Sequence, residues 1–97
     1  MPAAPFTPAQ REAILALASQ YGVGNMRLFG SRARGDAEPE SDYDFLFDAP
    51  PHLSLFKIFE LQEALEHFLG AKVDLVEEAA IRRPALKQYM LMDARPV

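Results

Sequence analysis

Three aspartates of this 97-residue chain stand where carboxylates could hold a divalent cation. Asp42 and Asp44 are two residues apart in an alternating segment, so on an extended strand both side chains project from one face. Two carboxylates that close repel unless a positive charge lies between them, and Mg²⁺ is the usual cation shared by carboxylates and substrate phosphates. Asp74 interrupts the apolar run 73–76, where an unpaired charge is costly to bury. If its strand lies beside that of Asp42 and Asp44, Asp74 shares the same metal.

A glycine and a serine precede these acids at a point where a strand is expected to end. At Gly30 the backbone can approach a phosphate closely, and Ser31 and the amides after it can donate hydrogen bonds to phosphate oxygens. Arg32 and Arg34 are the only positive charges near this turn, and either could hold phosphate oxygens or simply pair with neighbouring acids. With the three aspartates, the turn predicts a two-metal site for phosphoryl transfer. Asp74 could also accept the proton of an attacking hydroxyl.

The elements that must position these residues alternate between helix and strand. Thr7 can cap a first helix, Pro8 suits its first position and Gln10 completes a capping box. Such alternation predicts an α/β (α+β) domain, a small mixed sheet of three to four strands with helices packed on it. The other expected elements are a strand over 26–29, a loop over 31–41 that can open with a helical turn, a strand over 42–48, a helix over 54–69, a strand over 72–77 and a helix from Pro84.

Composition and charge narrow the function classes. Hydrophobic residues make up 49% and charged residues 25%, which is ordinary for a globular protein. The net charge of −4 argues against direct nucleic-acid binding, which normally needs a basic face. The lack of cysteine excludes disulfides and thiolate metal sites and suits a cytoplasmic location. No apolar run approaches a membrane span and no secretory signal is visible, so we expect one cytoplasmic domain over 1–97.

The spacing of the glycine-serine pair and the acids resembles a known motif. Gly30-Ser31, ten intervening residues and then the acids of 42–44 resemble the DNA polymerase beta-like nucleotidyltransferase superfamily. The fuller form GSRARG…SDYD and the short length look like its minimal (MNT) branch, and the resemblance covers essentially the whole chain. It implies a mixed sheet with helices, ATP and Mg²⁺ as cofactors, and nucleotidyl transfer. It also implies phosphate contacts for Gly30 and Ser31, and metal binding for Asp42, Asp44 and Asp74.

The minimal branch also implies a partner. Its members commonly act as antitoxins of a HEPN-domain RNase toxin, which they inactivate by attaching AMP to a tyrosine, so the resemblance predicts a hetero-oligomer. The helix expected over 54–69 has a wide apolar cover, which suits a partner surface as well as plain core. Two alternatives stay open: an antitoxin that neutralises its partner by binding alone, and a nucleotidyltransferase for a small molecule. The second is disfavoured because such enzymes generally carry an extra domain for the acceptor.

Overall fold

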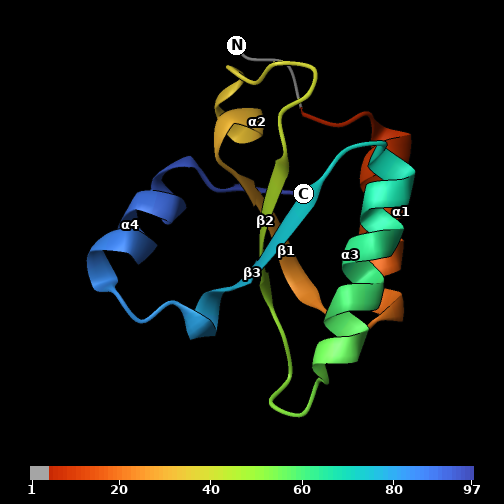
Figure 1. The fold of residues 1–97 in the computed structure, drawn as a ribbon, viewed down its shortest axis with the longest axis vertical. Coiled ribbons are helices and arrows are strands. Elements are labelled where there is room, and N and C mark those ends of the chain that lie inside the picture. The colour runs from red at the N-terminus through yellow and green to blue at the C-terminus, as the bar shows by residue number, and fades with distance from the viewer. Residues whose placement is uncertain (1–4) are drawn as a thin grey trace.

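A mixed sheet of four strands forms the centre of residues 5–97, the part of the chain that this computed structural model describes (Figure 1). In chain order the elements are α1 (Pro8–Gln20), β1 (Gly24–Phe29), α2 (Ser31–Arg34), β2 (Tyr43–Asp48), α3 (Leu55–Leu69), β3 (Val73–Glu77), the 3-10 helix η1 (Glu78–Ala80), α4 (Pro84–Asp93) and β4 (Arg95–Pro96). The strands lie in the order β3-β2-β1-β4, with β1 antiparallel to β2 and β4, and β2 parallel to β3. The predicted α/β fold is therefore confirmed.

Local signals define the ends of the two long helices. The side chain of Thr7 accepts a hydrogen bond from the N–H of Gln10 (3.1 Å), and the Gln10 side chain accepts one from the N–H of Thr7 (2.9 Å). This is the predicted capping box at the start of α1. At the start of α3, the Ser54 side chain accepts from the N–H of Lys57, and Gly70 ends the helix in the left-handed conformation with φ 67°. The boundaries of α1 and α3 thus follow from residues within a few positions of each end.

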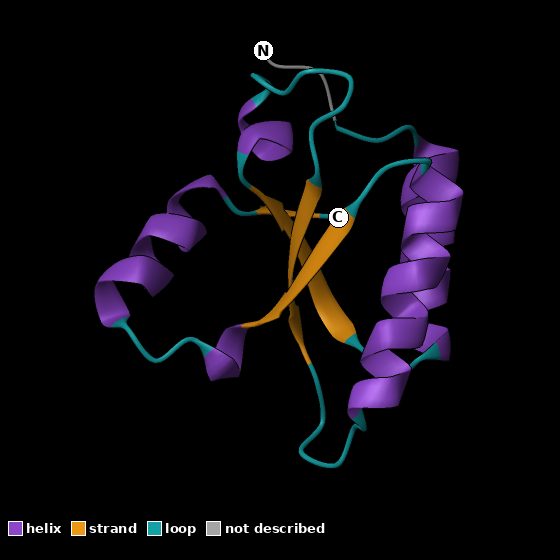
Figure 2. Ribbon diagram, in the orientation of Figure 1, coloured by secondary structure: helices purple, strands orange, loops and turns teal. Residues whose placement is uncertain are grey.

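The helices lie in two layers, one on each side of the sheet. Helices α1 and α3 cover one face, and α4 lies on the opposite side (Figure 2). Phe45 and Phe47 of β2 point into the core under α1 and α3, where both are almost fully buried. Because side chains alternate along a strand, Asp44 and Leu46 project from the other face. The strand therefore presents Phe45 and Phe47 to the core under α1 and α3, and presents Asp44 and the buried Leu46 to the opposite face.

The C-terminal segment departs from the sequence prediction. No strand is predicted at Arg95 and Pro96, yet they form β4, which pairs with Arg27 and Leu28 of β1. The two-residue strand contains a proline and has no alternating pattern, so nothing in the local sequence indicates it. It forms because α4 returns the chain to the free edge of β1.

Within residues 5–97, no helix combines the length and the apolar character needed to cross a membrane. Residues 1–4, which belong to the N-terminal segment where no secretory signal is expected, lie outside the described part of the chain.

Candidate active site

The parallel pairing of β2 and β3 brings two of the three predicted acids together. Asp44 is the direct register partner of Asp74. Paired residues of neighbouring strands project from the same face of a sheet, and Phe45 next to Asp44 points into the core on the other face. Both carboxylates therefore lie on the face opposite α1 and α3. Figure 1 shows α4 on that side of the sheet. The expectation that the strand of Asp74 lies beside that of Asp44 is confirmed.

The carboxyl group of Asp44 is held in an environment that disfavours its charge. Partial burial, together with repulsion by and hydrogen bonding with Asp74, raises the pKa of Asp44 from 3.8 to about 6. Repulsion from Asp42 adds to this rise, and the positive charge of Arg34 opposes it. Around Asp44 the negative charges of Asp42 and Asp74 outweigh the positive charge of Arg34. The candidate metal ligands of these three aspartates are all hard oxygen atoms. Mg²⁺ fits this donor set, because it prefers carboxylate and phosphate oxygens.

Asp42 stands slightly apart from the other two acids. It lies one residue before β2, which begins at Tyr43, so it belongs to the preceding loop and not to the strand predicted over 42–48. It is half-buried and close enough for its charge to raise the pKa of Asp44. Among residues 5–97, no three acidic, histidine or cysteine side chains are gathered closely enough to hold a metal ion as they stand. The structure thus pairs Asp44 with Asp74 and leaves Asp42 beside them, and metal binding by the three stays a prediction.

Gly30 makes room for the Asp44 carboxylate. Its backbone has φ 75° and ψ −158°, a combination that residues with a side chain rarely adopt. A Cβ atom at this position would lie 2.6 Å from Oδ2 of Asp44, which is well inside van der Waals contact. The pairing of Phe29 with Asp44 across β1 and β2 causes this close approach. Glycine is therefore required at position 30 for two reasons: the conformation of the turn and the space taken by the Asp44 carboxylate. The spacing of the motif does not reveal the second requirement.

Ser31 follows Gly30 and begins the short helix α2. The carbonyl of Gly30 accepts hydrogen bonds from the N–H groups of Ala33 and Arg34, both at 3.0 Å, which turns the chain sharply at the end of β1. Ser31 is half-buried at this turn, next to the residue that contacts Asp44. The predicted phosphate contacts of Gly30 and Ser31 are thus placed beside the acid pair, and they stay predictions.

Arg32 holds the loop that leads into β2. Its Nη2 atom donates to the carbonyl oxygens of Ser41 (2.8 Å) and Pro39 (3.0 Å), and its Nε atom donates to Ser41 (3.3 Å). The guanidinium carbon also lies 4.3 Å from the centre of the Tyr43 ring, a cation–π geometry. These contacts flank Asp42 on both sides. The predicted phosphate contact of Arg32 stays a prediction, but its observed partners belong to the loop.

Arg34 is paired with two acids from different parts of the chain. Its Nη1 atom donates to Asp93 at the end of α4 (2.9 Å), and its Nε atom donates to Asp36 (3.1 Å). Hydrogen bonding to Asp93, and then to Asp36, raises the pKa of Arg34. Sequence reasoning foresees pairing with nearby acids such as Asp36, but it misses Asp93, which lies 59 residues away with no local signal. A phosphate that binds Arg34 would have to compete with these partners.

Known proteins resemble this chain in sequence and in structure. A family model described as "Nucleotidyltransferase domain" matches residues 10–97. The protein adenylyltransferase MntA of Thermococcus cleftensis is 42% identical over 74 residues, which cover 76% of this chain and 75% of that protein. A solved structure of a protein described as a minimal nucleotidyltransferase superposes with a TM-score of 0.80 at 39% identity, covering 92% of this chain and 90% of that one. A crystal structure of a toxin–antitoxin with AMP-PNP reaches a TM-score of 0.75 at 25% identity, covering 89% and 70%.

Proposed function

Because the chain belongs to the nucleotidyltransferase domain family and is a minimal nucleotidyltransferase, we propose that it transfers AMP from ATP to a hydroxyl of a partner protein. The observation that carries this proposal is the pairing of Asp44 with Asp74 directly beside the Gly30–Ser31 turn. The relative from Thermococcus cleftensis is a protein adenylyltransferase, which supports AMP as the group transferred. The toxin–antitoxin structure that contains AMP-PNP, an ATP analogue, supports ATP as the donor.

The acids and the turn divide the chemistry between them. Asp44 and Asp74, with Asp42 beside them, would supply oxygen ligands to Mg²⁺, and Gly30 and Ser31 would contact the triphosphate. Bound Mg²⁺ would neutralise phosphate charge and make the acceptor hydroxyl more acidic. The acceptor oxygen forms a bond to the α-phosphorus, the bond from that phosphorus to the oxygen shared with the β-phosphate breaks, and pyrophosphate leaves. Asp74 is the residue we assign to accept the proton of the hydroxyl.

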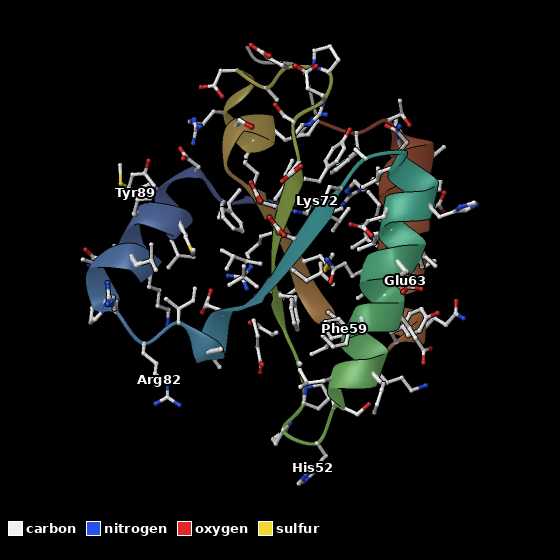
Figure 3. The ribbon with its side chains drawn as sticks, in the orientation of Figure 1. His52, Phe59, Glu63, Lys72, Arg82 and Tyr89 are labelled. Carbon is white, nitrogen blue, oxygen red and sulfur yellow. The ribbon has the colours of Figure 1, made fainter. Side chains whose placement is uncertain are left out.

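The proposed partner is a HEPN-domain RNase toxin, modified on a tyrosine. A toxin–antitoxin complex is among the structural neighbours, which supports a toxin as the acceptor. Helix α3 supports a hetero-oligomer, because several of its large apolar side chains stay exposed and are not buried in the core. Leu61 and Leu65 are fully buried, whereas Leu55, Phe56 and Phe59 are 68%, 79% and 57% exposed. Figure 3 shows Phe59 on this helix. Exposed aromatic and aliphatic groups gathered on one helix are typical of a protein–protein interface.

The test measures transfer of radiolabelled AMP from ATP, in the presence of Mg²⁺, to the protein encoded beside this one. We expect label on that protein with the wild type and none with Asp42→Asn/Asp44→Asn or with Asp74→Asn. Glu40→Gln is the matched control, because it removes one negative charge from the exposed loop and should transfer normally. Absence of label with the wild type, or undiminished label with the aspartate variants, would overturn the proposal.

The exposed face of α3 also favours a second candidate function, neutralisation of the toxin by binding alone. In that case the Asp42→Asn/Asp44→Asn variant should still form the complex and block the toxin as well as the wild type does. Inhibition of the RNase measured at saturating antitoxin, with and without ATP, separates the two. Inhibition that requires ATP and the intact aspartates excludes binding alone.

A further inference from the structure

Strand β3, which carries Asp74, lies at the edge of the sheet. Within residues 5–97 it pairs only with β2. The N–H of Tyr43 donates to the carbonyl of Lys72 (2.9 Å), so in a parallel ladder Lys72 and Asp74 direct their main-chain groups toward β2. Val73 between them directs its N–H and C=O outward. Unpaired main-chain groups make an edge strand prone to fray or to shift its register.

Two side chains of α3 pair both of these outward groups. The N–H of Val73 donates to Oε2 of Glu66 (3.0 Å), and Nε2 of Gln62 donates to the carbonyl oxygen of Val73 (2.8 Å). Gln62 and Glu66 are four residues apart, so they lie one turn apart on one side of the helix. Figure 3 labels two sequence neighbours of this contact, Glu63 on α3 and Lys72 just before β3. We call Gln62 and Glu66 the Val73 clamp.

The clamp acts on the peptide group that leads into Asp74. The carbonyl held by Gln62 belongs to the peptide bond between Val73 and Asp74, so its orientation limits rotation of the Asp74 backbone. The Val73 side chain is fully buried in the core, and this burial restrains the same residue further. Asp74 can face Asp44 only if this register is kept, because a shift of one residue would turn its side chain to the opposite face.

We propose that Gln62 and Glu66 are positioning residues, which hold Asp74 opposite Asp44 through the main chain of Val73. The proposal rests on the proposed function in taking Asp74 as a metal ligand. Both side chains hydrogen-bond the main chain of Val73, so the clamp reaches the acid pair through the residue next to Asp74. Its effect should therefore appear in metal affinity and in the mobility of the strand, and not in the overall fold.

The test compares Gln62→Met and Glu66→Met, which keep length and helix propensity but remove the hydrogen bonds, with Glu66→Gln, which keeps an acceptor. Glu63→Gln, on the exposed side of the same helix, is the matched control. We expect Mg²⁺ affinity to fall about 10- to 100-fold in the methionine variants, measured by calorimetry with α,β-methylene-ATP present, an analogue whose α,β-bridge cannot be cleaved. Glu66→Gln should restore most of it, and the control should match the wild type.

A second readout does not depend on metal or activity. Amide hydrogen exchange at Asp74 and Val76, whose N–H groups face β2, should become about tenfold faster in the methionine variants than in Glu63→Gln, because each variant loses one hydrogen bond that restrains the strand. Wild-type exchange together with wild-type Mg²⁺ affinity in both methionine variants would overturn the proposal. If either Gln62→Met or Glu66→Met fails to fold, the other variant tests the proposal, because each removes one of the two hydrogen bonds to Val73. Failure of the wild type to bind Mg²⁺ or transfer AMP would count against the proposed function, while the exchange rates still test the clamp.

Discussion

Replacing Asp44 by asparagine should stabilise the metal-free protein at neutral pH, although it removes a proposed metal ligand. The pKa of Asp44 in the folded protein is raised from 3.8 to about 6, mainly by burial and by the repulsion of Asp74. The folded state therefore holds this proton more tightly than the unfolded state does. The associated stability is fully present below pH 3.8 and is lost as the pH rises through about 6. The asparagine amide carries no charge at any of these pH values, so the variant avoids this loss.

The size of the effect follows from the pKa and from solvent exposure. A rise from 3.8 to about 6 corresponds to roughly 3 kcal/mol, at about 1.4 kcal/mol for each pH unit. Asp44 is only half-buried, so water screens much of this energy, and about 1 kcal/mol is the more realistic gain. In a domain of about 100 residues, 1 kcal/mol shifts the melting temperature by roughly 4–8 °C.

The assay is thermal unfolding in EDTA at several pH values, with Glu40→Gln as the control for the loss of one negative charge. At pH 7.5, Asp44→Asn should melt above both the wild type and the control. The advantage should shrink by about half at pH 5 and disappear below pH 3.8, where Asp44 is protonated in both states. Addition of Mg²⁺ at pH 7.5 should stabilise the wild type and not Asp44→Asn.

An Asp44→Asn variant that melts at or below the wild-type temperature in EDTA would refute this reasoning. So would an advantage that is the same at every pH between 4 and 8. Either result would mean that the charge of Asp44 is already compensated in the metal-free protein, and the electrostatic argument that these acids bind a cation would fail.

Three further predictions concern the turn, the loop and the metal. Gly30→Ala should destabilise the fold by about 1–3 kcal/mol, because the positive φ of Gly30 and its closeness to Asp44 both exclude a Cβ atom. Urea unfolding measures this loss, and an unchanged free energy of unfolding would show that the Asp44 carboxylate moves freely. Arg32→Met should make the loop over 35–42 more susceptible to limited proteolysis, because the hydrogen bonds to the carbonyls of Pro39 and Ser41 are lost. Arg32→Lys should protect the loop only in part, because a single ammonium group cannot reach both carbonyls. An unchanged cleavage rate in Arg32→Met would mean that these hydrogen bonds do not hold the loop. Mg²⁺ affinity should fall by up to about tenfold for each pH unit below pH 6, because protons compete with Mg²⁺ for the Asp44 carboxylate, whose pKa is about 6. Calorimetry between pH 5 and 8 measures this dependence, and an affinity that does not change with pH would exclude Asp44 as a ligand.

The local elements and the motif are readable from the sequence alone. The capping box at Thr7 and Gln10 and the end of α3 at Gly70 each depend on residues within a few positions of one another. Such short-range signals act in any context, so their predictions are confirmed with boundaries shifted by one or two residues. The glycine-serine pair and the acids at their fixed spacing likewise indicate the family, and the match to the nucleotidyltransferase domain over residues 10–97 confirms it.

What holds the site together depends on contacts between distant segments. Asp74 faces Asp44 because β3 lies parallel to β2 in a register that pairs these two residues, which are 30 positions apart in the chain. The contact of Gly30 with the Asp44 carboxylate, the pairing of Arg34 with Asp93 and the formation of β4 depend on the same assembly. These contacts form only when the helices and strands pack, so no window of sequence contains them. The residue types that could perform the chemistry are therefore visible in the chain, whereas their distances, charges and mutual supports arise from the tertiary structure.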